Sequence, residues 1–228
     1  MYFKLFFSRI MFFVTVEIIA IYRKLFRRFL YAPGFLLLDG TDGTGKTTIV
    51  SKLLSMGMSK KPYNHLLNWP TLSTLWEEIA DITQKLRDAG DPSVGGLYLQ
   101  LYRHDAGLFS SGLEQVMLVG SFLRFFAWNF GVSTPTPPKG FLRALWFFAN
   151  YPFPEKAVVL VTDVYELQKH YLERGDKTDE LNLSDRERVQ FLTLYLNTKF
   201  FGASVVNNTN CTVSETVNSV TKKLGLLL

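Results

Sequence analysis

Short apolar runs alternate along this chain with longer segments in which apolar residues recur at helical spacing. The runs predict buried strands at residues 35–38, 65–69, 116–119, 157–162 and 204–206. The longer segments predict helices at residues 47–56, 73–89, 91–109, 120–130, 141–150, 164–174, 184–200 and 214–224. Because strands that alternate with helices form parallel sheets, the pattern predicts an α/β fold, with a parallel five-stranded sheet and helices on both faces.

Local signals predict several boundaries. Pro33-Gly34 is expected to end an N-terminal helical segment, so that residues 1–32 precede one domain over residues 33–228. Ser184 and Glu187 have the spacing of a capping box and predict the start of the helix at 184–200. Three prolines predict a loop at residues 132–140, and a polar stretch predicts another at residues 175–183.

The N-terminal segment is apolar, aromatic and basic. Its best candidate for a membrane span, Leu5–Tyr22, contains Arg9 and Glu17 and is short of the roughly 20 apolar residues that a spanning helix needs. Three interpretations stay open: membrane contact through residues 1–32 with the remaining chain on the cytoplasmic side, a mitochondrial targeting segment, or an extra helix packed on the domain. The absence of a small-residue cleavage site argues against a secretory signal peptide.

Charge is distributed unevenly, although the isoelectric point is near 9.2. Six of the 25 Lys and Arg residues and one of the 20 Asp and Glu residues lie in residues 1–34, which leaves 19 of each sign in residues 35–228. The predicted domain is therefore neutral, and nothing indicates a nucleic-acid-binding face. The single cysteine, Cys211, excludes an internal disulfide and favours a reducing compartment.

Residues 35–48 read FLLLDGTDGTGKTT and carry the strongest chemical signal. Gly40, Gly45, Lys46 and Thr47 fit the phosphate-loop pattern G-x-x-x-x-G-K-[ST], between a predicted strand and a predicted helix. In that arrangement backbone N–H groups face phosphate oxygens, the lysine reaches the β- and γ-phosphates, and the threonine hydroxyl ligates Mg²⁺. The predicted ATP-binding residues are Gly40, Thr41, Asp42, Gly43, Thr44, Gly45, Lys46, Thr47 and Thr48, and the predicted Mg²⁺ ligands are Thr47 and Asp39.

With these elements placed, residues 35–224 resemble the thymidylate kinases, a group of nucleoside monophosphate kinases. The segments that carry the resemblance are, in chain order, DGTDGTGKTT, LLNWPTLST (66–74), LYLQLYRHD (97–105), FPEKAVVLVTDV (153–164), YLERGDKTDELNLSDRERVQFLTLY and VVNNTNCTVSETVNSV. Their order and spacing match the family, and the first segment is specific on its own.

The resemblance implies a three-layer P-loop kinase fold. It also implies an enzyme that transfers a phosphoryl group from ATP, with Mg²⁺, to a nucleoside monophosphate, and dTMP is the expected acceptor. It assigns catalysis to Lys46 and to Arg174, which would lie on a closing lid. It places Asp42 at the acceptor's sugar and Arg103 at its phosphate, where a planar guanidinium binds two oxygens at once. Acceptor contacts would also come from Trp69, Pro70 and Leu99, and we add Arg124 to them as a hypothesis of our own. A homodimer through the apolar faces of residues 97–130 is a further implication.

The chain departs from the family's pattern at several charged positions. Gly120-Ser121 stands where the family has Asp-Arg after its third strand, Asn68 replaces a phosphate-binding arginine, and Gly43 replaces an arginine that some members carry. We hypothesise that Arg124, one helical turn after Gly120, substitutes for one missing arginine. Three functions therefore stay open: a dTMP kinase, a kinase with a different acceptor, and a nucleotide-binding protein without catalysis.

Overall fold

A computed structural model describes residues 2–58, 61–63, 85, 116–131, 141–174 and 182–226, without the side chains of residues 2–8, 61–63, 141 and 174. Five strands form one sheet in the order β2-β3-β1-β4-β5, and all neighbours are parallel. They are β1 (Tyr31–Gly40), β2 (Lys61–Tyr63), β3 (Val116–Val119), β4 (Phe153–Val161) and β5 (Ser204–Asn207). The predicted five-stranded parallel sheet is confirmed, whereas the strand predicted at residues 65–69 lies outside the described residues.

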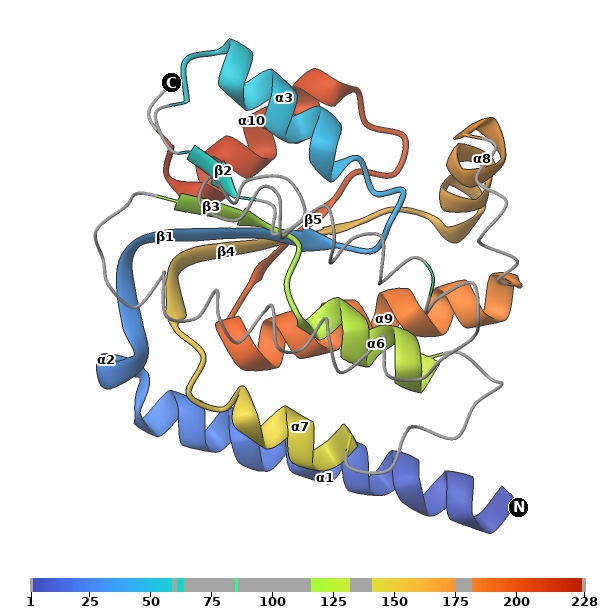
Figure 1. Ribbon diagram of the computed structural model, residues 1–228. Helices are drawn as coiled ribbons and strands as arrows, with labels where there is room; N and C mark the ends of the chain where they lie inside the picture. Colours follow the sequence, from blue (N-terminus) through green and yellow to red (C-terminus); the bar gives the residue numbers. More distant parts are fainter. Residues whose placement is uncertain are drawn as a thin grey trace.

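Helices cover both faces of the sheet, as predicted (Figure 1). Helices α3 (Lys46–Ser55) and α10 (Val213–Leu224) cover one face, and α6 (Leu123–Gly131) and α9 (Leu183–Phe201) cover the other. Outside α6 and α9 lie α1 (Tyr2–Leu25) and α7 (Phe141–Phe147), with the short α2 (Arg27–Leu30) at the end of α1. Helix α8 (Val164–Arg174) lies to one side of the sheet. The N-terminal segment thus adds a fourth layer to the predicted three.

Two boundary predictions are wrong, each for a local reason. Helix α9 is capped by Asn182, whose side chain accepts a hydrogen bond from the Asp185 amide at 2.9 Å, so the Ser184–Glu187 capping box does not form. The helical segment ends at Leu30, before Pro33-Gly34, because β1 already pairs with β4 from Tyr31 onward. The proline and glycine instead lie where the β1–β4 register shifts, a position that suits both residues.

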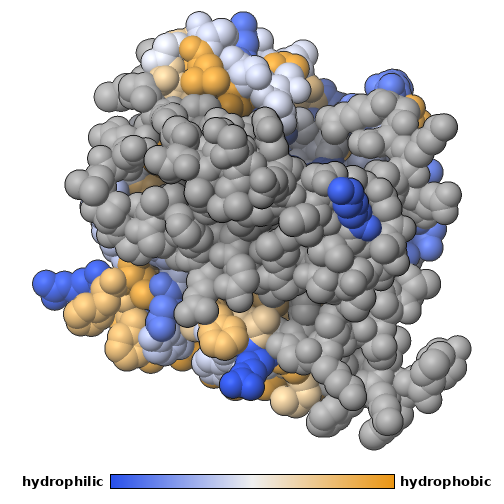
Figure 2. All heavy atoms as spheres, in the orientation of Figure 1, coloured by the Kyte–Doolittle hydropathy of each residue, from blue (hydrophilic) through white to orange (hydrophobic). Residues whose placement is uncertain are grey.

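Helix α1 carries two apolar stripes on opposite sides. The inner stripe, Phe12, Val16 and Ile19, is fully buried in the same core as α6, α7 and α9, and Phe12 stacks on Phe130 with ring centroids 3.9 Å apart. The outer stripe is exposed and consists of Ile10, Val14, Ile18, Ile21 and Leu25. Apolar side chains accordingly gather along the lower edge of the face in Figure 2. Among the described residues, no helix combines the length and apolar character needed to cross a membrane.

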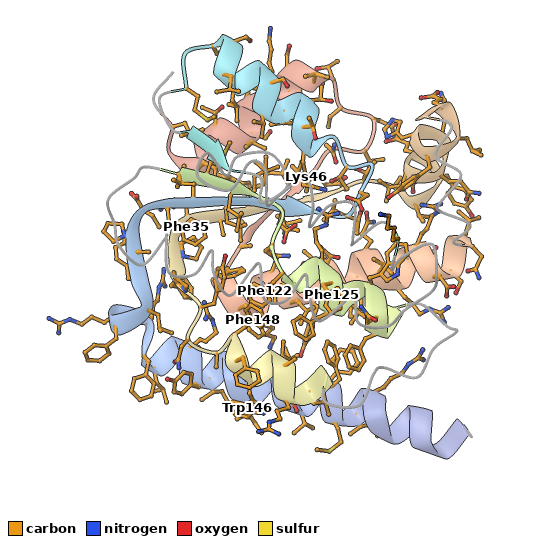
Figure 3. The ribbon with its side chains drawn as sticks, in the orientation of Figure 1. Phe35, Lys46, Phe122, Phe125, Trp146 and Phe148 are labelled. Atoms are coloured by element: carbon orange, nitrogen blue, oxygen red, sulfur yellow. The ribbon has the colours of Figure 1, made fainter. Side chains whose placement is uncertain are left out.

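An aromatic core fills the space between the sheet and the outer helices (Figure 3). Phe122 is at its centre: its ring stacks on Phe148 at 4.1 Å between centroids and lies 4.7 Å from the ring of Tyr151. Phe126 and Phe200 complete the contacts at right angles to it. Because these rings come from the start of α6, the segment between α7 and β4, and α9, they fix the position of the β3–α6 connection next to the phosphate loop.

Arg23 ties α1 to the rest of the fold. It is fully buried, and its guanidinium donates hydrogen bonds to the carbonyl oxygens of Tyr151 at 2.7 Å, Ala149 at 2.9 Å and Phe200 at 2.9 Å. Burial lowers the pKa of Arg23 to about 9, so the side chain is still charged at neutral pH. The carbonyl oxygens therefore compensate a buried charge. The Phe200 carbonyl lies in the last turn of α9, where a cation is favourable, and the other two lie in the segment between α7 and β4.

An ion pair on the other flank of α1 gives a prediction on pH dependence. Glu17 accepts hydrogen bonds from Lys199 Nζ at 2.9 Å and Tyr195 Oη at 2.6 Å, and these bonds lower the pKa of Glu17 below 4.5. Because the folded-state pKa is lowered, the carboxylate stabilises the fold above its unfolded pKa and loses this effect as pH falls through the folded value. Glu17→Gln is expected to lower the free energy of unfolding at neutral pH by less than about 1 kcal/mol, since the pair is partly exposed.

Urea unfolding of the wild type and of Glu17→Gln tests this prediction. The difference between the two proteins should narrow as pH falls below 4.5, the unperturbed value for Glu17. A difference that stays constant with pH would show that the glutamate acts through packing and not through its charge.

Candidate active site

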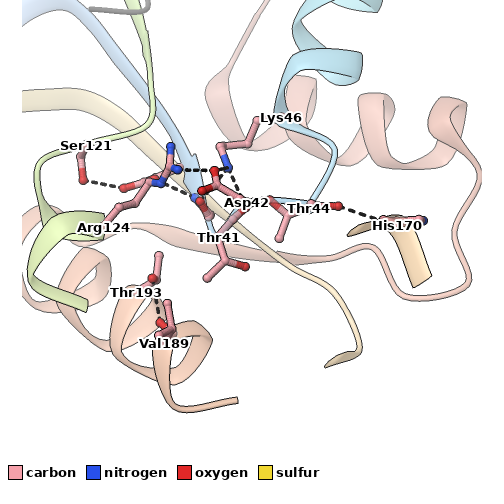
Figure 4. A network of polar contacts seen from close by, with 12 residues as sticks. Thr41, Asp42, Thr44, Lys46, Ser121, Arg124, His170, Val189 and Thr193 are labelled. Atoms are coloured by element: carbon pink, nitrogen blue, oxygen red, sulfur yellow. Dashed lines mark hydrogen bonds and ion pairs between the residues drawn. The ribbon is translucent and has the colours of Figure 1, made fainter. Parts of the chain in front are cut away.

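The phosphate loop occupies the carboxyl end of β1, between β3 and β4, where ligands bind in open parallel sheets. Lys46 Nζ donates hydrogen bonds to the carbonyl oxygens of Gly40 at 2.8 Å and Thr41 at 2.6 Å, so the loop folds around this side chain (Figure 4). Gly45 precedes α3 and offers no side chain to cap it. Thr47 and Thr48 are exposed in the first turn. The first turn of α3 thus presents backbone N–H donors and hydroxyl groups to an incoming anion.

Arg124 reaches the phosphate loop from α6. Its Nη2 donates to Asp42 Oδ1, and Lys46 Nζ lies 3.8 Å from the same oxygen, so two cations flank one loop carboxylate. Gly120 makes this possible. A Cβ at Gly120 would lie 2.8 Å from Arg124 Nη1, and the φ of +87° at Gly120 is unfavourable for any residue with a side chain. Gly120, which stands where the thymidylate kinase pattern has an aspartate, therefore leaves the space that Arg124 occupies.

Asp39 lies under the loop, fully buried. Its carboxylate accepts hydrogen bonds from Ser121 Oγ at 2.5 Å, from Asn197 Nδ2 at 3.0 Å and from the Gly40 amide at 2.8 Å. These bonds join the ends of β1 and β3 to α9. Sequence patterns did not identify Asn197, because it lies within an ordinary helix 158 residues from Asp39.

Helix α8 packs directly on the loop. His170 Nδ1 lies 3.1 Å from the Gly43 carbonyl oxygen, and a Cβ at Gly43 would lie 3.2 Å from Leu167 and 3.3 Å from Tyr171. A side chain at position 43 would therefore require Leu167 and Tyr171 to shift by a few tenths of an ångström, and the φ of +84° would strain it as well. From the opposite side, Asn208 Nδ2 donates to the Thr44 carbonyl oxygen at 3.1 Å. Asn208 follows β5 at its carboxyl end, a position that could have marked it in the sequence.

A cavity of about 480 Å³ opens beside the loop. The loop contributes Gly45 and Thr48, α8 contributes Glu166 and His170, and the segment after β5 contributes Asn208 and Asn210. Its volume is in the range of small-molecule sites, and polar groups line it together with Ile49 and Val213.

The predicted site residues fall into two groups. The structure brings Asp39, Arg124 and the loop residues 40–48 together. Arg174 is the last residue of α8, and its side chain lies outside the described part of the chain. Trp69, Pro70, Leu99 and Arg103 also lie outside it.

Comparisons with known proteins place this geometry in a known fold. No protein-family model matches the chain, and no curated protein matches its sequence significantly. Among solved structures, thymidylate kinase from Candida albicans is similar with a TM-score of 0.55 and 14% identity, over 82% of this chain and 89% of that one. Deoxyadenosine kinase from M. mycoides with bound dATP is similar with a TM-score of 0.56 and 14% identity, over 83% of this chain and 98% of that one.

The chain has the P-loop nucleoside and nucleotide kinase fold. This kinase fold places the phosphate loop, Arg124 and the cavity at the carboxyl edge of its sheet. At 14% identity the similarity establishes the fold, and the acceptor has to be argued from the site.

Proposed function

We propose that this protein transfers the γ-phosphoryl group of ATP to a nucleoside monophosphate, with dTMP as the first acceptor to test. One observation carries the proposal: the phosphate loop is built around Lys46, a nucleotide-sized cavity opens on one side of it, and Arg124 reaches it from another. Positive charge on several sides of a phosphate position is what phosphoryl transfer requires, because its barrier is mainly electrostatic.

The donor's phosphates would lie on the backbone N–H groups of the loop and the first turn of α3. Lys46 Nζ donates to the loop's own carbonyl oxygens, so the ammonium group already lies inside the loop. When ATP binds, this group would donate to the oxygens of the β- and γ-phosphates. Gly45 and Thr48 line the cavity next to the loop, so phosphates bound there would continue into it. Asn208 and Asn210, which line the same cavity, would offer polar groups to the rest of the nucleotide.

The donor set fits a magnesium ion that enters with the nucleotide. Thr47 exposes a hydroxyl in the first turn of α3, and Asp39 supplies a carboxylate beneath the loop. Both are the hard oxygen donors that Mg²⁺ prefers, and Mg²⁺ commonly keeps several waters beside such ligands. When bound, Mg²⁺ would neutralise part of the negative charge of the nucleotide's phosphates. Since Asp39 is enclosed by Ser121 and Asn197, we expect it to act through water or by orienting neighbours.

Transfer breaks the bond from the γ-phosphorus to the bridging oxygen of ATP and forms a bond to an acceptor phosphate oxygen, so that ADP leaves. Arg124 would contact the moving phosphoryl group, and Asp42, which now forms an ion pair with its guanidinium, would hold it near the loop until substrate arrives. Following the resemblance, Arg103 would bind the acceptor's phosphate, and Arg174 would approach when the segment after α8 closes.

A deoxynucleoside is the second candidate acceptor. The similarity to the M. mycoides deoxyadenosine kinase is as strong as that to the Candida thymidylate kinase, with TM-scores of 0.56 and 0.55. Asn68 also lacks the charge that the thymidylate kinase pattern places near the acceptor phosphate. An acceptor without a phosphate would need fewer cations.

An ADP-release assay with the complete chain, ATP and Mg²⁺ tests the proposal. The acceptors are dTMP, dUMP, dCMP, dGMP, deoxyadenosine and no acceptor, and Lys46→Ala serves as the blank. Turnover with dTMP that Lys46→Ala abolishes would support the proposal. Turnover with deoxyadenosine alone would support the second candidate, and ATP binding without turnover on any acceptor would refute both.

A further inference from the structure

We infer that the outward face of the N-terminal layer is a membrane-docking surface, on which the protein lies against an anionic lipid bilayer. This outer face consists of the exposed apolar side chains of α1, α2 and α7: Ile10, Val14, Ile18, Ile21, Leu25, Phe26, Phe29, Trp146 and Phe147. Figure 3 shows Trp146 on the side of α7 that is next to α1. Helices α1 and α7 form one layer at the bottom of Figure 1, on the far side of α6 and α9 from the sheet, and α2 lies at the end of α1 where the chain turns toward β1.

The pattern on α1 is unusual for a surface helix. A helix at the surface of a globular protein normally turns polar residues to the solvent, and one that is apolar all round is normally buried. Here the inner stripe is buried against the protein, and the outer stripe repeats at the same helical spacing and is exposed, with no described part of the chain packed over it. Because one side of α1 is packed on the domain, the helix can meet lipid only with its outer side, in the plane of the interface.

The basic residues that surround the outer face favour a negatively charged partner. Lys24 on α1, Arg27 and Arg28 on α2, and Arg143 on α7 are exposed on the same three helices. Glu17 is the one acidic residue in residues 1–34, and its carboxylate is bonded to Lys199 and Tyr195 of α9. An apolar stripe flanked by basic residues is the signature of helices that bind anionic membrane surfaces.

A second copy of the chain is the less favourable occupant. In a symmetric dimer the same patch meets itself, so the basic residues of the two copies would face one another and repel. An anionic bilayer attracts those residues instead, by a factor of about five in binding for each one near the surface.

Co-sedimentation of the complete protein with vesicles tests the inference, using vesicles of phosphatidylcholine alone or mixed with phosphatidylserine. Binding is expected with the phosphatidylserine vesicles and should weaken as salt is added. Ile18→Ser with Ile21→Ser is expected to reduce binding about tenfold or more. Lys24→Gln with Arg28→Gln is expected to reduce it about 25-fold. Arg27 is left unchanged because its guanidinium packs over the Phe153 ring.

Matched controls come from the opposite side of the sheet. Leu54 on α3 is 44% exposed, close to the 48% of Ile18, and Lys52 and Lys222 are exposed on α3 and α10. Leu54→Ser and the double variant Lys52→Gln with Lys222→Gln should leave vesicle binding unchanged. Circular dichroism and melting temperature establish that each variant is folded.

Three results would overturn the inference. The first is that the complete chain does not sediment with anionic vesicles at low salt, and the second is that the control variants lose binding as much as the outer-face variants. The third is that sedimentation equilibrium shows a dimer, which Ile18→Ser with Ile21→Ser converts to a monomer, while no variant binds vesicles. None of these readouts depends on turnover, so they are independent of the kinase assay.

Discussion

Removal of residues 1–30 is expected to yield a chain that does not fold cooperatively. Phe12, Val16 and Ile19 are fully buried, and burial of such side chains contributes about 1.5–3 kcal/mol each, against a total stability of about 5–15 kcal/mol for a typical domain. The truncated chain would also leave the carbonyl oxygens of Tyr151 and Phe200 without the Arg23 guanidinium that now binds them. Thermal unfolding followed by circular dichroism, together with limited proteolysis, should show no cooperative transition.

A matched pair of point variants separates this packing from any effect of chain length. Ile19→Ala creates a cavity in the inner stripe and is expected to lower the free energy of unfolding by about 2–5 kcal/mol. Each kcal/mol corresponds to about 2–4 °C in melting temperature for a chain of this size. Ile18→Ala, on the exposed stripe one residue earlier, should change the melting temperature little. Cooperative melting of residues 31–228 at the wild-type temperature would contradict the prediction.

Arg124→Ala is expected to lower kcat about a thousandfold while ATP binding changes little. The reason is that an arginine which acts on the transferring phosphoryl group stabilises charge that develops mainly in the transition state. Steady-state kinetics with the best acceptor, together with a fluorescent-nucleotide binding assay, would separate the two effects. Arg143→Ala removes an exposed arginine of α7 and serves as the control. Equal turnover in wild type and Arg124→Ala would show that the Asp42–Arg124 contact is structural alone.

Gly120→Ala tests the same geometry without removal of the charge. The added Cβ would lie 2.8 Å from Arg124 Nη1, so the guanidinium has to move. Displacement of a catalytic group by about 1 Å can cost up to about 100-fold in rate, and a loss of about tenfold to 100-fold is expected here. Melting temperatures should be compared as well, because the φ of +87° at position 120 also strains an alanine.

Much of the fold was accessible from the sequence because its signals are local. The phosphate loop is flanked by an apolar run and by a helix of the right length, and both appear in the structure. The start of β4 was predicted four residues late, at Ala157, because Pro154, Glu155 and Lys156 interrupt the apolar run. Glu155 nevertheless belongs there, since its carboxylate accepts a hydrogen bond from Gly34 in the neighbouring strand, 121 residues away.

The arrangement of the site was less predictable, because its contacts join distant parts of the chain. Arg124 was expected near the loop from its helical spacing, but the sequence does not show that it would bind Asp42 across the space left by Gly120. The Asp39–Ser121–Asn197 cluster joins three elements, and an asparagine inside a helix carries no pattern of its own. For α1, composition left three interpretations open, and only the positions of α6, α7 and α9 show what its inner stripe contacts.

The hydrogen bond from Arg23 to Phe200 also sets an order of events during synthesis. The two residues are 177 positions apart, so α1 leaves the ribosome long before its partner exists. At roughly 5–20 residues per second, the delay is about 10–35 s. Throughout that time a nascent helix that is apolar on both sides has no binding site on α9. We therefore expect a chaperone or a lipid surface to cover this helix until translation is nearly complete.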